Sequence, residues 1–338
     1  MSVMRVHIRQ ARTTVEVTEG QTLLEAAIAA GVAYPHGCRS GRCGACKSRL
    51  IEGDVELLPH TRFALSDDEK ADGLILACRA LPRTEAAVAW LGDAAAVEPA
   101  YDVSGTVTEL NDLTHDIKRI RISLDARGPL FFEAGQYAHV RFEGAPGRSY
   151  SMANTPGQDS LEFHIRRVPG GMTSGHVHEA LRVGDKARLD LPLGSSFLRQ
   201  HHPGPILCIA GGSGLAPIQS IVETALAQGM KQPIHVYFGA RAERDLYRIE
   251  HFQTLARSRP SLAFTPVLSD SPAAAYRSGL VTQAVAQDLS DLKGWTAYVA
   301  GPPSMVDAAM AAAFAAGLHR DDMHADAFFT PSQSVVAE

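Results

Sequence analysis

The chain has 338 residues, 45% hydrophobic and 20% charged, so it is long enough for two or three domains and apolar enough to bury a core in each. Its 32 Lys and Arg against 37 Asp and Glu give a formal charge of −5, which excludes the global positive field that would attract nucleic acid or an anionic membrane. There is no apolar run of the roughly 20 residues that a membrane-spanning helix needs, and residues 1–10 lack the apolar stretch of a signal peptide, so we expect a cytoplasmic protein.

Four of the five cysteines lie within the first 78 residues, in a spacing that indicates a metal centre. Cys38, Cys43 and Cys46 follow the pattern C-x4-C-x2-C, and Cys78 comes after 31 further residues. This is the plant-type spacing for a 2Fe-2S cluster. Glycines between the cysteines would let the backbone curl around two irons. A four-cysteine zinc site is the alternative, but zinc favours two C-x2-C pairs, and this set contains only one.

The segment around these cysteines is locally basic. Between residues 36 and 50 there is no acidic residue, and the cations are Arg39, Arg42, Lys47 and Arg49. They could form a docking patch for an acidic electron acceptor. They could equally offset the negative charge of the thiolates and sulfides. The sequence leaves both interpretations open.

Composition then separates three domains. A first domain is expected at residues 1–93, and a linker at 94–101, which has no hydrophobic period and contains a proline. Short β-branched or alternating segments follow, separated by turn residues. They predict strands at 103–110, 117–124, 136–142, 161–168 and 187–191, with one helix at about 173–182. Strands at this spacing predict an antiparallel β-barrel domain at 102–202.

From residue 203 to 338 apolar strands alternate with helical patterns, which predicts an α/β doubly wound parallel sheet. The expected strands are 206–210, 234–238, 263–268 and 296–300, and the expected helices are 215–228, 244–257 and 305–316. Cys208, the fifth cysteine, lies inside the first of these strands and is interpreted as a small core residue.

Three short motifs in the barrel region favour a flavin. The first is Arg148, Ser149, Tyr150 and Ser151, because an arginine suits a phosphate, a tyrosine offers a face to a flat ring and a serine can donate to a ring nitrogen. The second lies within a strand: His164, Ile165 and Arg166. The third begins the predicted helix, where free N–H groups favour a pyrophosphate: Gly171, Met172, Thr173 and Ser174. Each motif is weak alone, and together they predict FAD.

Two glycine-containing loops in the last region favour a nicotinamide nucleotide. Each follows a strand and opens a helix, so both could border one crevice at a topological switch point. The first contributes Gly212, Ser213, Gly214 and Pro217, and the second contributes Gly301, Pro302, Pro303 and Met305. Arg241, after the next strand, has acidic neighbours. An acid there would favour a ribose hydroxyl and an arginine a 2′-phosphate, so NADH and NADPH both stay possible.

These motifs, in this order, resemble the three-domain iron–sulfur flavoprotein reductases that feed Rieske ring-hydroxylating oxygenases, most closely the naphthalene dioxygenase reductase type. The resemblance spans the chain and includes an acid-x-aromatic ending at Asp326 and Phe328. It implies a β-grasp ferredoxin domain, a ferredoxin reductase-like FAD barrel and an NAD domain. It also implies that Ser151, Asp326 and Phe328 lie near the reactive part of the flavin. One departure is Ala300, where relatives often have cysteine.

The three cofactor patterns form a logical series. Hydride carries two electrons, while a 2Fe-2S cluster accepts only one at a time. A flavin can accept the hydride and then release its electrons singly. We therefore expect electrons to pass from NADH or NADPH to FAD, to the cluster, and on to an oxygenase component or its Rieske ferredoxin. Alternative acceptors are a diiron monooxygenase and a deoxysugar dehydratase system. A non-catalytic redox sensor, or a zinc-bearing binding module, is an alternative of another class.

Overall fold

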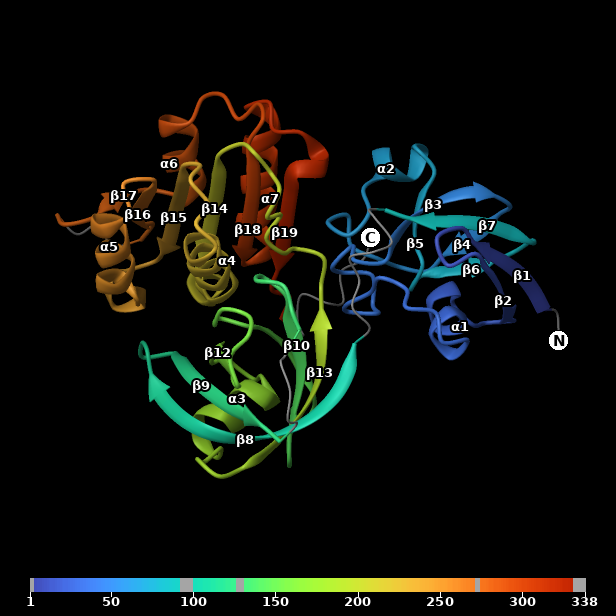
Figure 1. The fold of residues 1–338 in the computed structure, drawn as a ribbon, viewed down its shortest axis with the longest axis horizontal. Helices are drawn as coiled ribbons and strands as arrows, with labels where there is room; N and C mark the ends of the chain where they lie inside the picture. Colours follow the sequence, from blue (N-terminus) through green and yellow to red (C-terminus); the bar gives the residue numbers. More distant parts are fainter. Residues whose placement is uncertain (1–2, 92–99, 126–130, 271–273, 331–338) are drawn as a thin grey trace. The chain divides into compact units, whose positions relative to one another are not determined.

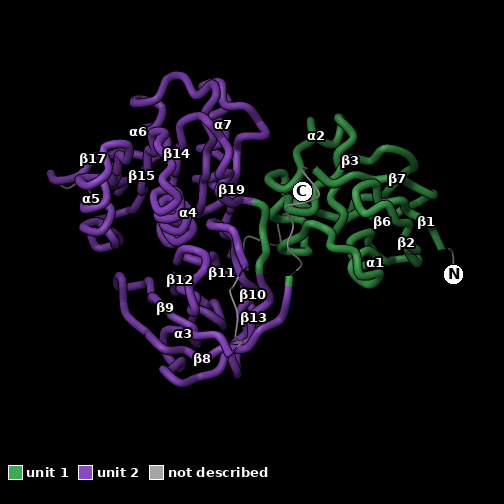
Figure 2. The backbone as a smooth tube through the Cα atoms, in the orientation of Figure 1, with its two compact units in different colours: residues 1–100, 192–195, 331–338 green, residues 101–191, 196–330 purple. Residues whose placement is uncertain are grey.

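The computed structural model describes residues 3–91, 100–125, 131–270 and 274–330. The chain forms two compact units, one made mainly of residues 1–100 and the other mainly of residues 101–330 (Figures 1 and 2). Most of the predicted linker, residues 94–99, lies outside the described residues. In the described ranges, no helix combines the length and the apolar character needed to cross a bilayer.

The first unit is built on a mixed five-stranded sheet in the order β2-β1-β7-β3-β5, in which only β1 and β7 run parallel. Its elements are β1 (Val3–Ile8), β2 (Thr13–Thr18), α1 (Leu23–Ala29), β3 (Lys47–Glu52), β4 (Val55–Leu57), α2 (Asp67–Ala71), β5 (Leu74–Leu76), β6 (Ala80–Pro82) and β7 (Ala86–Trp90). Helix α1 begins at a capping box, because Glu25 N donates to Thr22 Oγ1 (3.3 Å) and Thr22 N donates to Glu25 Oε2 (2.9 Å). Strands β1 and β2 alternate buried and exposed residues, which fixes the face that covers the core.

The second unit opens with an antiparallel six-stranded sheet in the order β11-β10-β13-β8-β9-β12. Its elements are β8 (Tyr101–Asp112), β9 (Ile117–Leu124), β10 (Tyr137–Phe142), β11 (Arg148–Ser151), β12 (Ser160–Arg166), α3 (Met172–Glu179) and β13 (Lys186–Leu193). A bridge between Met152 and Phe163 joins the end of β11 to β12, so the two edge strands meet. This closes the sheet into a barrel around an apolar core, as predicted.

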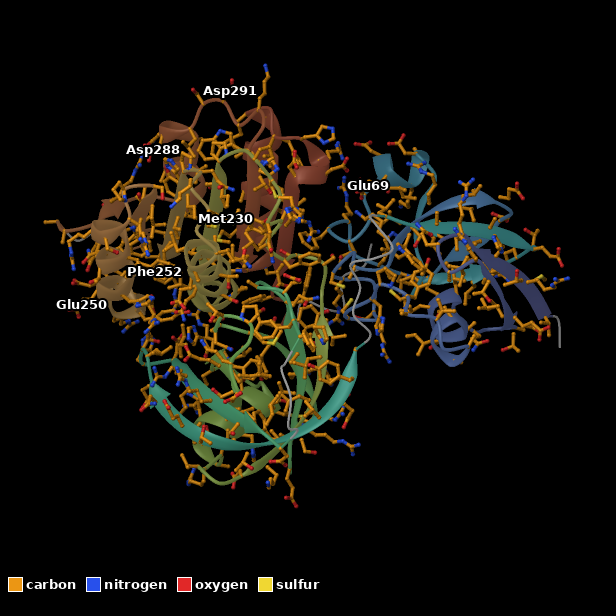
Figure 3. All side chains as sticks on the ribbon, viewed as in Figure 1. Glu69, Met230, Glu250, Phe252, Asp288 and Asp291 are labelled. Carbon is orange, nitrogen blue, oxygen red and sulfur yellow. The ribbon has the colours of Figure 1, made fainter. Side chains whose placement is uncertain are left out.

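The rest of the second unit is a parallel six-stranded sheet in the order β17-β16-β15-β14-β18-β19. Its strands are β14 (Ile206–Gly211), β15 (Ile234–Ala240), β16 (Leu262–Leu268), β17 (Arg277–Ser278), β18 (Thr296–Gly301) and β19 (Met323–Ala327). Its helices are α4 (Leu215–Ala227), α5 (Ile249–Ser258), α6 (Val281–Asp288) and α7 (Pro303–Ala315), with short 3-10 helices η2 (Gly212–Gly214), η3 (Glu243–Asp245) and η4 (Arg320–Asp322). Phe252 of α5, labelled in Figure 3, is fully buried and stacks on Phe264 with ring centroids 4.8 Å apart.

The doubly wound prediction is confirmed, with one boundary corrected. A single helix was expected at 244–257, whereas the structure has the separate turn η3 and starts α5 at Ile249. Arg248 takes a left-handed conformation (φ 59°), and Asp245 accepts a hydrogen bond from Ala242 N (3.1 Å), which caps the turn. The short strands β11, β17 and β19 and the helix α6 were not predicted.

Candidate functional site

The four predicted cluster cysteines come together in the first unit. The Cys38 sulfur accepts hydrogen bonds from Arg42 N (3.2 Å) and Ser40 N (3.5 Å), and the Cys43 sulfur accepts one from Cys38 N (3.3 Å). The Cys43 thiol and these backbone donors lower the pKa of Cys38 to about 5. Backbone donors that point at sulfur stabilise thiolates, which are the form that binds iron.

The sulfurs group in two pairs, which fits two irons better than one zinc. Cys38 N donates to Cys43 Sγ at 3.3 Å, and Cys78 N donates to Cys46 Sγ at 3.4 Å. A single tetrahedral zinc would hold all four sulfurs about 3.8 Å apart. Among the described residues, however, the one group of three or more ligands lying within 4.8 Å of one another contains no cysteine.

Two glycines in this loop have a positive φ and lie tightly against neighbouring residues. Gly41 has φ +73°, and a Cβ there would lie 2.8 Å from His60 Cβ and 2.9 Å from Arg79 Cγ. Gly44 has φ +71°, and its Cβ would lie 3.2 Å from Ala64 O. Both conformations favour glycine. The tight turn that gathers the thiols therefore depends on these two residues.

The basic residues around the cysteine loop differ in whether they have a partner in the fold. Lys47 pairs with Glu69 at 2.6 Å and Arg49 donates to Asp72 O at 2.7 Å, so these two belong to the fold. Within the described part of the chain, Arg39, Arg42 and Arg79 have no carboxylate partner. These three residues form what we call the loop rim.

The predicted flavin residues on β11 lie at the junction with the nucleotide domain. Ser151 is buried, and its hydroxyl donates to Asp326 Oδ2 of β19 at 2.9 Å. Tyr150 packs against the barrel core, and burial raises its pKa. Arg148 and Ser149 are exposed, and Arg148 forms no ion pair with any described residue. An exposed cation beside a half-buried ring and a buried hydroxyl fits a bound flavin nucleotide.

The start of α3 is also suited to an anion. Its N-cap, Gly171, provides no side-chain cap, and a Cβ there would lie 2.6 Å from Ser174 Oγ. Thr173 donates to Pro146 O (2.6 Å) and Ser174 donates to Gly171 O (3.3 Å), so both hydroxyls already serve the protein. The backbone N–H groups of the first turn are therefore the donors that remain. Met172 is 73% exposed beside them.

The side chain of His164 contacts other protein groups, whereas its motif predicted a flavin contact. Its side chain is buried between Glu162 Oε1 (Nε2 at 3.0 Å) and the Tyr247 hydroxyl (Nδ1 at 3.2 Å). Burial lowers the pKa of His164. Burial would raise the pKa of Glu162, but hydrogen bonds from His164 and Arg121 lower it to about 2. Both ring nitrogens are engaged, so only the backbone of His164 could contact a flavin. Ile165 is buried in the barrel core.

The two nucleotide loops lie side by side at the switch point of the parallel sheet. Strands β14 and β18 are neighbours, and Ala210 is the Cα partner of Ala300. A Cβ on Gly214 would lie 2.1 Å from Ala300 O, and one on Gly301 would lie 2.9 Å from Gly211 O. Pro302 and Met305 pack over Gly211 in the same way. Ser213 and Pro303 are partly exposed, and Pro217 is buried. The starts of α4 and α7 have no side-chain cap, so their N–H groups face this edge.

The last strand, β19, pairs with β18 beside the second nucleotide loop. Asp326 is the Cα partner of Ala300, and Phe328 N donates to Gly301 O at 2.8 Å. The structure thus brings Ser151, Asp326 and Phe328, predicted from widely separated segments, to the border between the barrel and the nucleotide loops.

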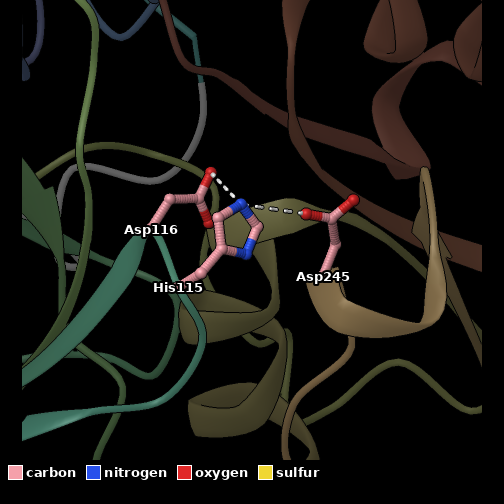
Figure 4. A group of neighbouring side chains, drawn as sticks. All are labelled: His115, Asp116 and Asp245. Carbon is pink, nitrogen blue, oxygen red and sulfur yellow. Dashed lines mark ion pairs between the residues drawn. The ribbon is translucent and has the colours of Figure 1, made fainter.

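A charged cluster at the same border contains residues that the sequence did not single out. His115 Nε2 lies 3.7 Å from Asp245 Oδ1 and 4.0 Å from Asp116 Oδ2 (Figure 4). Three such ligands could suggest a metal ion, but Arg166 Nε is 2.8 Å from Asp116 Oδ2, and Arg241 Nη2 is 3.2 Å from Asp245 Oδ1. Two guanidinium groups already neutralise both carboxylates, which disfavours a cation here. No spacing in the sequence links these segments, so only the fold could have revealed them.

Comparison with known protein families gives three matches in chain order. Residues 6–83 match a 2Fe-2S iron-sulfur cluster binding domain, residues 104–197 an oxidoreductase FAD-binding domain, and residues 208–311 an oxidoreductase NAD-binding domain. The cofactors of the chain are therefore a 2Fe-2S cluster, FAD and NAD(P)H. The predicted fold class is confirmed, while the domain boundaries and the individual site residues stay predictions.

Whole-chain relatives agree. The chain is 42% identical over 314 residues to the reductase component of the naphthalene 1,2-dioxygenase/salicylate 5-hydroxylase systems of a Ralstonia species, covering 92% of this chain and 94% of that one. It is 38% identical over 330 residues to the naphthalene 1,2-dioxygenase reductase component of Pseudomonas putida, covering 96% and 99%. Among solved structures, a cytochrome P450 reductase from Amycolatopsis matches with a TM-score of 0.79 at 38% identity, covering 96% and 98%. The chain belongs to the family of three-domain ferredoxin–FAD–NAD reductases, the reductase components of ring-hydroxylating and related oxygenase systems.

Proposed function

We propose that this chain is the reductase component of an oxygenase system that hydroxylates an aromatic compound. It takes electrons from NAD(P)H and passes them through FAD and the cluster to a Rieske oxygenase component or its ferredoxin. The names of the Ralstonia and Pseudomonas putida relatives support this class of acceptor. The supply of NAD(P)H inside the cell supports the cytoplasm as its location.

The observation that carries the electron path is the contact between Ser151 and Asp326 at 2.9 Å. It joins the end of the predicted flavin motif to a strand whose neighbour bears the second nucleotide loop. A flavin held by β11 and a nicotinamide held by the loops would then share one wall. FAD, when bound there, accepts hydride from NAD(P)H and releases single electrons, which is what a one-electron cluster requires.

Within this proposal the residues of this chain bind the three cofactors and orient them. Arg148 and the N–H groups of α3 would hold the flavin phosphates, and Tyr150 would offer an aromatic face to the flavin. The Ser151 hydroxyl, held by Asp326, would serve the reactive part of the flavin. The N–H groups at the uncapped starts of α4 and α7 would bind the nucleotide phosphates. The four paired thiolates would hold the irons.

The names of other relatives support a second class of electron acceptor, the monooxygenases. Reductase components of phenol 2-monooxygenase from a Pseudomonas strain and of propane 2-monooxygenase from a Gordonia strain are 36% and 35% identical to this chain. Reconstitution of the purified reductase with candidate oxygenase components from the same cell, followed by oxygen uptake, distinguishes a Rieske dioxygenase from a monooxygenase.

The electron path itself is tested by anaerobic mixing with NADH. The holoprotein should lose flavin and cluster absorbance, and Cys43→Ser should lose the cluster while its FAD is still reduced. Bleaching of the cluster in flavin-free protein would contradict the order. Zinc in place of iron, or the absence of NADH oxidation with any artificial acceptor, would favour the sensor alternative.

A further inference from the structure

Helix α4 contacts the barrel through two buried polar side chains. Gln219 Nε2 donates to Ala153 O at 3.2 Å. Ser220 Oγ donates to Asn154 O at 2.7 Å. Gln219 is 2% exposed and Ser220 is fully buried, so neither side chain has water to replace these partners. The two hydrogen bonds therefore hold α4 against one short backbone segment of the barrel.

That backbone segment directly follows the predicted flavin motif. Ser151 ends the motif, and only Met152 separates it from Ala153. Ala153 is fully buried, and its N donates to Glu162 O of β12 at 2.8 Å. Asn154 Oδ1 in turn accepts from Glu162 N at 2.8 Å. Because the segment is paired with β12, it has little freedom to move independently of Ser151.

At its other end, α4 begins at the first nucleotide loop. The loop residues Gly212–Gly214 form η2, which runs directly into α4 at Leu215. Gln219 lies about one turn further along the helix. A single helical turn is short and rigid, so a contact that fixes Gln219 also fixes the position of the loop.

A third contact fixes the amide of Gln219 itself. Arg248 Nε donates to Gln219 Oε1 at 2.9 Å, which leaves the Nε2 side of the amide for Ala153 O. Arg248 Nη2 also lies 3.7 Å from Glu223 Oε1 of α4. The backbone of Arg248 is left-handed (φ 59°), a conformation that persists in a residue with a side chain where its surroundings hold it. The arginine is therefore anchored, and it keeps the amide in one orientation.

A buried histidine completes the link between the two domains. The hydroxyl of Tyr247, the residue before Arg248, lies 3.2 Å from His164 Nδ1, and His164 Nε2 lies 3.0 Å from Glu162 Oε1. Burial lowers the pKa of His164, so the ring is neutral, with Nε2 donating to the carboxylate and Nδ1 accepting from the tyrosine. These contacts close a circle of residues that we call the contact ring: Ala153, Glu162, His164, Tyr247, Arg248 and Gln219.

We propose that Gln219 is a positioning residue for hydride transfer, which couples the end of the flavin motif to the first nucleotide loop and so sets the distance between the hydride donor and the flavin. This inference rests on the proposed function, because that function assigns the flavin to β11 and the dinucleotide to the loops. Gln219 acts through the backbone of Ala153 and through α4, without touching either cofactor. An apolar pair at 219 and 220 would need no buried partners but would leave the two segments free to slide.

Gln219→Met tests this role, because methionine has a similar length and shape but forms none of these hydrogen bonds. In anaerobic stopped-flow mixing, the limiting rate of flavin reduction by NADH should fall about tenfold, since a misplacement of about 1 Å can cost up to a hundredfold in rate. The dissociation constant of NAD+ should change less than twofold, because the N–H groups of the loop are untouched. The long-wavelength charge-transfer absorbance of the reduced protein with NAD+ should weaken.

Two further variants of α4 bracket this result. Ser220→Ala removes one hydrogen bond to the same backbone segment and should slow reduction in the same direction by a smaller factor. The matched control is Thr224→Val, one turn later on the same helix. The Thr224 hydroxyl is buried and has no hydrogen-bond partner among the described residues, so its loss should change neither the rate nor the charge-transfer absorbance.

Hydrogen exchange provides a measurement that does not depend on activity. In holoprotein without NADH, peptides that cover residues 152–164 and 212–220 should exchange faster in Gln219→Met than in the wild-type protein. Peptides from β3 in the first unit should exchange equally in both, because no residue of the contact ring lies there. Equal exchange in all peptides would contradict the coupling.

Two kinetic outcomes would overturn the inference. An unchanged reduction rate with a lower thermal midpoint would show that Gln219 contributes to stability alone, and a rise in the dissociation constant that accounts for the whole loss would assign it to binding. Failure of the wild-type protein to reduce its flavin with NADH would instead refute the proposed function, so the two failures are distinguishable. FAD content is measured for each variant, and Ser220→Ala carries the test if Gln219→Met does not fold.

Discussion

Ser151 and Asp326 show how much of this protein rests on single side-chain contacts. They are 175 positions apart in the chain, yet the serine hydroxyl donates to the carboxylate at 2.9 Å. Ser151 is buried at 7% exposure, so the hydroxyl has little water to replace this partner. The contact aligns a polar group at the border between the two proposed ligand sites.

Replacing this hydroxyl should slow hydride transfer more than binding. For Ser151→Ala we expect flavin reduction by NADH to slow at least tenfold, with less than a twofold change in the dissociation constant of NAD+, because removing a transition-state contact leaves ground-state binding intact. Stopped-flow absorbance under anaerobic conditions measures the first quantity, and calorimetry the second. FAD content serves as the control for cofactor loss. An unchanged reduction rate would contradict the assigned role.

The buried His324 predicts that the second unit loses stability as the pH falls. It is buried on β19, stacks on Tyr298 with centroids 5.1 Å apart, and burial lowers its pKa to about 3. Its pKa in the unfolded chain is about 6.5, so its contribution to stability is present above pH 6.5 and is lost as the pH falls from there toward 3. The loss approaches about 1.4 kcal/mol per pH unit within that window.

His324→Phe removes this titration while keeping an aromatic ring against Tyr298. We expect the thermal midpoint of the wild-type holoprotein to fall more steeply between pH 7.5 and pH 5 than that of the variant. Circular dichroism at several pH values measures both midpoints. Parallel pH dependence of the two proteins would show that other groups dominate the acid response.

At the scale of elements, glycines set the loops that hold the proposed ligands. Gly41 and Gly44 turn the cysteine loop with positive φ, and Gly214 lets β14 and β18 bring their loops into contact. In each case the nearest atom that a Cβ would meet is a backbone or Cβ atom of another segment. These are positions where alanine displaces an element.

A matched pair of glycines tests this point. Gly41 and Gly20 share a positive φ (+73° and +80°), but a Cβ on Gly20 meets nothing within 4 Å. Both alanine variants should lose about 1 kcal/mol from the strained conformation. Only Gly41→Ala should also lose iron, because its loop must move away from His60 and Arg79. Iron and acid-labile sulfide per chain are the measurement, and full iron in Gly41→Ala would refute the packing argument.

Elements with a clear period could be predicted from the sequence. The alternation of β9 and the apolar runs of β14 and β18 identified them as strands, and loops at the ends of β14 and β18 were placed correctly because strand-to-helix junctions carry glycine. The two-residue strand β17 carries no period. The start of α5 was wrong because the left-handed Arg248 leaves no compositional mark.

Some residues of the candidate site could likewise be predicted from local sequence patterns, and others could not. The cysteine ligands and the glycine loops are local patterns, so spacing alone pointed to them. Asp116, Tyr247 and Asp245 contact residues from distant segments of the chain. The sequence near Arg166 and His164 gives no sign of these partners. Contacts between distant segments depend on how the sheets pack, which a single sequence does not display.

At the scale of the whole molecule, the net charge of −5 hides an opposite local charge. The loop rim, Arg39, Arg42 and Arg79, carries three cations next to the cluster thiols, and none has a carboxylate partner among the described residues. Such a patch attracts an acidic acceptor at low salt and is screened over about 8 Å at physiological ionic strength.

We expect the double change Arg39→Gln with Arg42→Gln to slow reduction of an acidic acceptor, soluble cytochrome b5, several-fold at low salt and to flatten its dependence on ionic strength. Arg5→Gln, on β1 opposite Glu16, is the control with a cation removed elsewhere in the same unit. A shift in the cluster potential without any change in acceptor kinetics would instead favour charge compensation. Cytochrome c, a basic acceptor, should respond in the opposite direction.

Cys208 has a practical consequence for anyone who prepares this protein. Of the five cysteines in the chain, it is the one outside the cluster set, it is fully buried, and burial raises its pKa. A maleimide added to folded protein will therefore ignore it. Any adduct on the folded protein then comes from a cluster cysteine that has lost its iron, with no background thiol to subtract.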